Sequence, residues 1–204
     1  MGDEENLPDW QRTKPLGKLT CTSSKCEEGL HSFLRNFRGR KRTNEMSYRS
    51  EACTSCGVKI IDWERLDERD LNDVKYTIEA LRKELFRRRY WARRIDKKLL
   101  EPLLEKELSE IEKKVENRIR KYVNKKFNDN PWDGRQTPLE GNLIYFAQHA
   151  TASCCKKCIE EWHGINRNEL LTEEQIKYLV GLIMVYFENR MQSPQAEGNR
   201  KITP

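Results

Sequence analysis

The 204-residue sequence contains no run of apolar residues that approaches the roughly 18–20 needed to cross a bilayer. Residues 1–10 are acidic, rather than basic and then apolar, so they do not resemble a secretory leader. We therefore expect no membrane segment and a cytoplasmic location. Apolar residues make up only 36% of the chain and charged residues 35%, which leaves little material for a large apolar core.

Several familiar enzyme signatures are also missing. The sequence has no phosphate-cradling glycine loop, no dinucleotide-binding fingerprint and no His-x-Glu motif of the deaminase type. These absences argue against the nucleotide-dependent enzymes and deaminases that such motifs mark. The net charge of +6 is compatible with an anionic partner, but it does not identify one.

Seven cysteines are many for a cytosolic chain, and their odd number disfavours complete disulfide pairing. They fall into close groups near the start and near the end of the sequence. Such grouping is typical of metal ligation rather than of a secreted disulfide framework. We therefore expect two Zn²⁺ ions as cofactors.

The first predicted zinc shell lies in a loop-rich segment with many serines. Its ligands are Cys21, Cys26, Cys53 and Cys56. Two short loops can each point two sulfurs inward, and Gly57 directly after the second pair permits the positive φ often needed there. His31 is a rival ligand that could replace Cys21 or Cys26. The alternative is that these are ordinary free cysteines.

The second predicted zinc shell lies in a dense cluster of cysteine and histidine. Its candidate ligands are His149, Cys154, Cys155, Cys158 and His163. The spacing of the cysteines and the four-residue step to His163 resemble those of zinc fingers. If His163 and the three cysteines bind the metal, His149 is left free as a general base. Alternatively, the cysteines pack in a buried helix and both histidines serve as hydrogen-bond partners.

Apolar residues recur at steps of three and four over most of the second half, which predicts a mainly α protein. One long helix is expected from Asp70 to about Ile95 and a second over 104–122, packed as an antiparallel hairpin. Residues 143–146 form an apolar run that fits a strand or a buried turn. The last helix is the clearest, because Thr172 and Gln175 form a capping box before a segment that is apolar on most sides.

The predicted organisation is one composite domain over 19–191 with loose ends. Its parts are a flexible N-terminus (1–18), a loop-rich zinc-knuckle-like module (19–66), the long helical hairpin (67–127), a Cys/His zinc-binding region with the buried C-terminal helix (128–191) and a flexible tail (192–204). Zinc would compensate for the shortage of apolar material.

The last third of the chain carries a long and distinctive motif. It reads Gly134-Arg-Gln-Thr-Pro138, then Ala147-Gln-His-Ala-Thr-Ala-Ser-Cys-Cys-Lys-Lys-Cys158, then Trp162-His163-Gly-Ile165. This motif resembles a bacterial and phage family catalogued as a domain of unknown function, although Lys156 stands where that family has arginine. The resemblance implies that the family's core site surrounds Gln148, His149 and the three cysteines, and it implies no activity.

Basic residues make nucleic acid the expected partner, in a setting such as DNA repair or phage defence. The candidate phosphate-binding residues are Arg35, Arg38, Arg40, Lys41, Arg42, Arg49, Arg87, Arg88, Arg89, Arg93 and Arg94. Zinc-held loops commonly present arginines to phosphates. The simpler interpretation of the run over 87–94 is a solvated helix face with acidic partners.

Two other functions fit the sequence. The protein could be a nuclease or glycosylase, with His149, Gln148 and Glu140 as catalytic candidates in a polar cleft. It could instead be an interaction scaffold, in which the apolar C-terminal helix docks a partner or forms a homo-oligomer.

Overall fold

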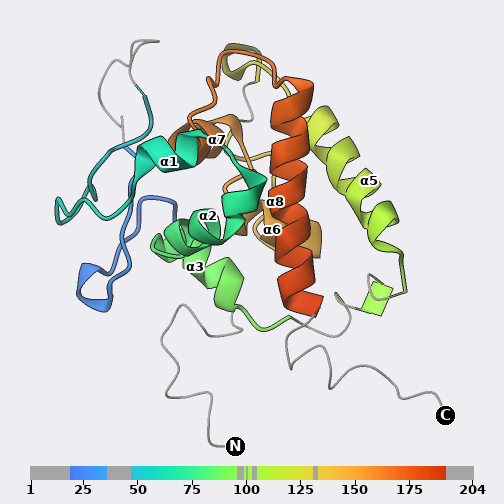
Figure 1. Ribbon diagram of the computed structural model, residues 1–204, viewed down its shortest axis with the longest axis horizontal. Coiled ribbons are helices and arrows are strands. Elements are labelled where there is room, and N and C mark those ends of the chain that lie inside the picture. The colour runs from blue at the N-terminus through green and yellow to red at the C-terminus, as the bar shows by residue number, and fades with distance from the viewer. Residues whose placement is uncertain are drawn as a thin grey trace, which may run out of the picture.

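The computed structural model describes residues 19–35, 47–95, 99, 101–102, 105–130 and 133–191. Its regular elements, in chain order, are η2 (Cys26–Glu28), α1 (Trp63–Asp67), η3 (Leu71–Asp73), α2 (Val74–Leu81), α3 (Leu85–Ala92), α5 (Leu108–Arg118), η4 (Ile119–Val123), η5 (Phe127–Asp129), α6 (Leu143–Ala150), α7 (Lys156–His163) and α8 (Glu173–Met191) (Figure 1). Over these ranges there are isolated β-bridges but no strand, so the prediction of a mainly α protein is confirmed. None of the described helices combines the length and the apolar character that a membrane span requires.

Helix α8 is the centre of the main core. Helices α5 and α6 both pack against it, and α3 packs against α6. In Figure 1, α8 runs the height of the molecule with α5 along its outer side. The apolar side chains of α8 are buried on most sides, as predicted: Ile176, Tyr178, Leu179, Val180, Leu182, Ile183, Tyr186 and Phe187. Gly181 allows Leu71 to approach, because a Cβ at this glycine would lie 2.9 Å from a Leu71 methyl carbon.

The capping box predicted before α8 is present. The Thr172 amide donates to Gln175 Oε1 at 3.0 Å, and the Gln175 amide donates to Thr172 Oγ1 at 3.3 Å. Two N–H groups that lack partners inside the helix are thereby satisfied. This local signal placed the start of α8 correctly from the sequence.

The long helix expected from Asp70 to Ile95 is wrong, because the chain breaks between α2 and α3. The backbone of His31 intrudes at the break: its amide donates to Lys83 O at 2.7 Å, and its carbonyl accepts from the Leu85 amide at 3.1 Å. The apolar spacing continues across the break and hides it. The expected antiparallel hairpin is not formed either, since α5 packs against α8.

The apolar run over 143–146 is neither a strand nor a turn but the first turn of α6. Asn142 caps this helix, and its Oδ1 accepts from the Ile144 amide at 2.8 Å. A second core lies next to α6 and α7, where the Phe33, Trp63 and Trp162 rings meet edge to face or tilted, with centroids 5.3–5.8 Å apart. This second core includes cysteines of both clusters, namely Cys53 of the first and Cys154, Cys155 and Cys158 of the second. The predicted flexible ends, 1–18 and 192–204, lie outside the described residues.

Candidate metal centres

The first cysteine cluster joins two loops from the N-terminal part of the chain. Cys26 opens η2, and a bridge between Lys25 and Leu30 closes the loop that carries it to His31. In the second loop the Gly57 amide donates to Cys53 O at 2.9 Å, at a φ of +76°. This tight turn brings Cys53 and Cys56 to one side, so glycine serves here for the reason the sequence suggested.

Four ligand atoms converge at this first centre: those of Cys26, His31, Cys53 and Cys56, all within 4.8 Å of one another. The Cys26 and Cys53 sulfurs are 3.8 Å apart, and His31 Nδ1 is 3.5 Å from the Cys56 sulfur. A tetrahedral zinc ion with Zn–S near 2.3 Å and Zn–N near 2.05 Å gives S···S edges of about 3.8 Å and S···N edges of about 3.5 Å. The two printed separations therefore match the edges of a zinc tetrahedron.

The charge state of the first centre also suits a cation. Burial raises the pKa of the Cys53 thiol, but the backbone N–H groups of Ser32, Cys56 and Ser55 donate to its sulfur and lower that pKa to about 6. Burial and the neighbouring Cys56 and Cys53 sulfurs raise the pKa of Cys26 to about 11. The cluster thus holds one sulfur as a thiolate near neutral pH and gains more when a cation displaces the remaining protons.

The second cluster lies between α6 and α7 in the interior. Cys154, Cys155 and Cys158 place their sulfurs within 4.8 Å of one another, and each side chain is buried. Cys155 caps α7, and its carbonyl accepts from the Ile159 amide at 3.0 Å, so that Cys158 follows on the first turn. Thr137 Oγ1 donates to Cys154 O at 2.9 Å and fixes the approach to this turn.

A buried arginine lies against these sulfurs. Arg87 is fully buried, and its Nη2 is 3.0 Å from the Cys158 sulfur. Hydrogen bonds from Cys154, Cys155 and Cys21, together with the Arg87 charge, hold the pKa of Cys158 well below its usual range. The Arg87 Nε donates to Glu84 Oε2 at 3.2 Å. The guanidinium is therefore the cation that balances a thiolate in the interior.

The two histidines predicted for the second shell are placed elsewhere. His163 Nε2 donates to Thr151 O at 3.0 Å, and its Nδ1 accepts from the Tyr178 hydroxyl at 3.2 Å. His149 Nε2 donates to Pro138 O at 3.1 Å, and its ring stacks on Tyr90 with centroids 4.8 Å apart. Burial lowers the pKa of each imidazole to about 4. Both rings serve as neutral hydrogen-bond partners, as the alternative interpretation of the sequence expected.

The structure also corrects the first shell. His31, the rival ligand, occupies the position that the sequence assigned to Cys21. Cys21 is turned toward the second cluster, where Arg87 Nη2 lies 3.9 Å from its sulfur. Sequence spacing could not separate these cases, because Cys21 and His31 each lie five residues from Cys26 in opposite directions.

Among the described arginines predicted to bind phosphates, Arg49, Arg87, Arg89 and Arg93 are committed to the fold. Arg87 and Arg89 are buried. The run over 87–94 is therefore not a continuous binding surface, and it is not a continuous solvated face either. Arg93 lies over Phe146 and pairs with Glu140 at 3.5 Å. Arg88 is half-buried at the edge of a surface pocket, whereas Arg94 is exposed.

Arg49 is also occupied, since its guanidinium makes two hydrogen bonds of 2.6 Å with the Asp67 carboxylate and lies over Trp63. Arg35 is exposed. The rest of the first basic stretch, Arg38, Arg40, Lys41 and Arg42, lies outside the described residues.

The three catalytic candidates do not face a common point. Gln148 is buried, and its Oε1 accepts from Arg118 Nε at 2.6 Å. His149 is bound to Pro138 O, and Glu140 pairs with Arg93. Each side chain therefore has a structural partner of its own. The buried Arg87–Glu84 pair beside the second cluster was missed, because a run of charges in a sequence reads as exposed surface.

The fold and the site define a mainly α protein with two cysteine clusters that could hold metal ions. Residues 75–188 match the family model described as "Domain of unknown function (DUF4186)", and the chain belongs to that family. The match covers more than the last third in which the sequence motif lies. It includes the second cluster and leaves the first cluster outside. No solved structure matches the chain.

Proposed function

We propose that this protein is a zinc-binding protein in which metal fastens the N-terminal loops to the helical family domain, and that it binds nucleic acid through an exposed basic face. The observation that carries the zinc assignment is the agreement of the 3.8 Å and 3.5 Å ligand separations with tetrahedral edges. Three sulfurs and one imidazole are the donors that zinc prefers.

The first centre is structural in this proposal. Its four protein ligands complete a zinc shell and leave no position for a reactive water. Zinc held there ties Cys26 and His31 to the loop of Cys53 and Cys56, and His31 in turn bonds the backbone on both sides of Glu84. Metal analysis of protein purified without added zinc tests the assignment, which fails if the folded protein is metal-free.

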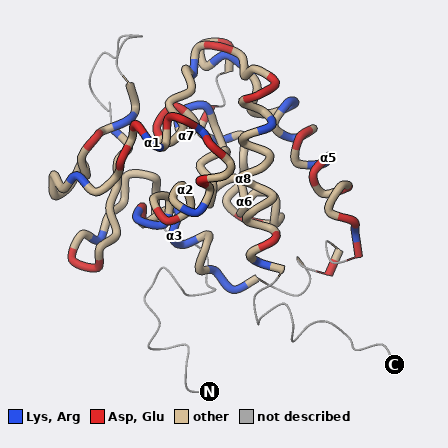
Figure 2. Tube along the Cα trace, viewed as in Figure 1, with Lys and Arg blue, Asp and Glu red and all other residues tan. Residues whose placement is uncertain are grey.

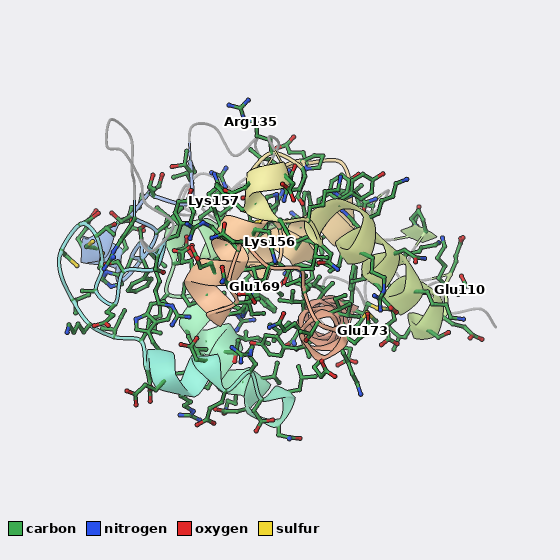
Figure 3. All side chains as sticks on the ribbon, turned by 90° about the horizontal axis from the view of Figure 1, so that it is seen from above. Glu110, Arg135, Lys156, Lys157, Glu169 and Glu173 are labelled. Atoms are coloured by element: carbon green, nitrogen blue, oxygen red, sulfur yellow. The ribbon has the colours of Figure 1, made fainter. Side chains whose placement is uncertain are left out.

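The proposed nucleic-acid face begins at Lys157 on α7. Lys157 Nζ lies 5.8 Å from the centroid of the Tyr48 ring, which in turn meets the Phe127 ring at 6.1 Å. A Cβ at Gly134 would lie 2.9 Å from Lys157 Nζ, so the loop carrying Arg135 adjoins the same lysine. In Figure 3, Arg135 projects outward beyond Lys157.

Four exposed basic residues and the half-buried Lys157 belong to this chain of contacts. We call the Lys157 face the set Arg35, Lys125, Lys126, Arg135 and Lys157. The Arg35 amide donates to Tyr48 O at 2.8 Å, so the Arg35 backbone lies beside Tyr48, whose ring meets Phe127 next to Lys126. Lysine and arginine side chains grouped in this way can bind the phosphate groups of a nucleic acid.

Acidic residues are interspersed with the basic ones over this part of the molecule (Figure 2). Two of these acidic residues are bound to groups of the protein itself. Glu160 pairs with Arg167 at 2.6 Å, and Asp133 accepts from the backbone amide of Lys156 at 2.9 Å. Glu160 and Asp133 are therefore engaged within the protein.

Fluorescence anisotropy with labelled single- and double-stranded DNA and RNA at several salt concentrations tests this proposal. Charge reversal of Lys126, Arg135 and Lys157 to Glu should weaken binding and reduce the slope of log affinity against log salt by about 2–3, since each lost phosphate contact contributes about 0.7–0.9. The matched control reverses three exposed lysines on α5 and α8, namely Lys113, Lys114 and Lys177. Equal losses in the two triple variants, or affinity that does not depend on salt, would contradict the proposal.

The other two functions are less well supported. The Gln148, His149 and Glu140 side chains each bind a different structural partner, so the geometry favours no hydrolytic site there. The apolar residues of α8, which suggested a docking helix, are covered by α5 and α6 of the same chain.

A further inference from the structure

Cys21 lies beside the second cysteine cluster, although it is close in sequence to the first. The Arg87 Nη2 atom is 3.9 Å from the Cys21 sulfur and 3.0 Å from the Cys158 sulfur. The Cys21 and Cys158 sulfurs therefore approach the same nitrogen of Arg87. Arg87 Nη1 lies 3.9 Å from Cys154, so one guanidinium contacts sulfurs from both segments.

The backbone around Cys21 accounts for this placement. The Ser23 amide donates to Thr20 O at 3.0 Å in a turn that contains Cys21. The Cys21 carbonyl accepts from Ser32 Oγ at 3.0 Å, which anchors the turn to the segment after His31. Cys21 and Cys26, separated by four residues, are thereby directed to different clusters.

We propose that Cys21 is the fourth ligand of a second zinc centre, formed with Cys154, Cys155 and Cys158. This inference deepens the metal-binding part of the proposed function and rests on it, but it is independent of nucleic-acid binding. Residues 75–188, the family domain, then supply three sulfurs, and the N-terminal segment supplies the fourth. The centre is a structural one, because four thiolates close the shell.

The surroundings of the second cluster suit a four-thiolate zinc centre. Zinc with four thiolates carries a net charge of about −2, which is costly in an interior unless cations and N–H donors face the sulfurs. Arg87 supplies a fully buried cation whose N–H groups approach three of the four sulfurs. The same guanidinium also pairs with Glu84 at 3.2 Å and Glu161 at 3.9 Å. Donors of this kind orient metal ligands and strengthen binding.

Native mass spectrometry of serine variants of the full chain tests the assignment. The wild-type protein should carry two zinc ions. Cys26→Ser is the matched control, because it makes the same change in the same segment and should empty only the first centre. Cys21→Ser should weaken the second centre by more than the roughly 10–100-fold that outer-shell changes cost, as measured by competition with a chromogenic zinc chelator.

The double variant separates the two possible shells. If Cys21 belongs to the second centre, Cys21→Ser with Cys26→Ser loses both zinc ions. If Cys21 belongs to the first centre, the double variant loses no more zinc than either single variant, and the proposal is overturned. A wild-type protein without zinc would overturn the metal assignment as a whole. A single zinc ion that survives Cys21→Ser but not Cys26→Ser would overturn only the second centre.

Substitution by Co²⁺ counts the thiolates directly. Charge-transfer absorption between sulfur and cobalt rises with the number of thiolate ligands. On a background of Cys53→Ser with Cys56→Ser, which removes the first centre, Cys21→Ser should lower the remaining absorption by about a quarter, as four thiolates become three. Unchanged absorption would show that Cys21 only packs against the site.

Thiol protection in the wild-type protein keeps the proposal testable if the variants do not fold. Stepwise chelation followed by alkylation and peptide mapping should expose Cys21 in the same step as Cys158. Exposure of Cys21 together with Cys26 would refute the proposal. So would a metal-free protein whose intact mass is lower by two hydrogens for each disulfide formed.

Discussion

Loss of the first metal centre should weaken the backbone hydrogen bonds at the junction between α2 and α3, which lies outside that centre. The perturbation is His31→Ala, which removes the one nitrogen ligand and leaves three sulfurs. The backbone of His31 holds the amide of Leu85 and the carbonyl of Lys83 at 3.1 Å and 2.7 Å. Once the ring no longer anchors this residue to the metal, these two hydrogen bonds should open more often.

The expected loss of stability follows from the linkage between metal binding and folding. Free zinc at about a thousandfold above its dissociation constant stabilises the folded state by about 4 kcal/mol at one site. For a chain of this length, 1 kcal/mol corresponds to about 2–4 °C in Tm. His31→Ala should therefore lower Tm by about 8–16 °C in zinc-containing buffer. In chelator the two proteins should differ much less.

Scanning calorimetry and hydrogen exchange measured by mass spectrometry check both parts of this prediction. Ser24→Ala is the control, because Ser24 Oγ bonds Ser55 Oγ at 2.7 Å between the same two loops and cannot serve as a zinc thiolate. That change should cost only about 1 kcal/mol. The reasoning would be refuted if His31→Ala matched Ser24→Ala in Tm, or if exchange at Leu85 stayed unchanged after zinc removal.

Two further predictions concern α7. Gly164→Ala should destabilise the protein by about 1–3 kcal/mol in urea unfolding, because φ is +61° and the new Cβ would collide with the Asp67 carboxylate. A neutral outcome would mean that Asp67 gives way easily. His163→Asn should flatten the acid limb of stability. The His163 pKa of about 4 lies below its unfolded value of about 6.5, so its contribution is complete above that value and falls by about 2 kcal/mol by pH 5; parallel pH profiles would contradict this.

Local signals in the sequence predicted the elements that local forces determine. The Thr172 and Gln175 capping box fixed the start of α8, because both partners lie within one turn. The grouping of cysteines likewise predicted two clusters that could hold metal ions. The Asn142 cap could have revealed α6, but the apolar run after it is as short as a strand, so periodicity alone could not decide.

The remaining features depend on contacts between distant residues. The break at Glu84 arises from the backbone of His31, more than fifty positions earlier, and no pattern inside α2 or α3 signals it. Arg87 is buried because thiol groups and Glu84 surround it, whereas a charge run in isolation predicts exposure. Cys21 and Cys158 both approach Arg87, whereas spacing along the chain favoured Cys26 as the companion of Cys21.

The small apolar content of the N-terminal segment explains why metal matters most there. Over residues 19–35 and 47–61, the buried aliphatic and aromatic side chains are Leu30, Phe33 and Ile61. Full burial of such a side chain contributes about 1.5–3 kcal/mol, whereas ordering each residue of backbone costs about 1–2 kcal/mol. Apolar packing alone therefore leaves these loops short of stability. Metal ligands between Cys21 and Cys56 can offset the deficit. They attach the loops to the helical part beside Glu84, through the His31 backbone, and beside Arg87, through Cys21.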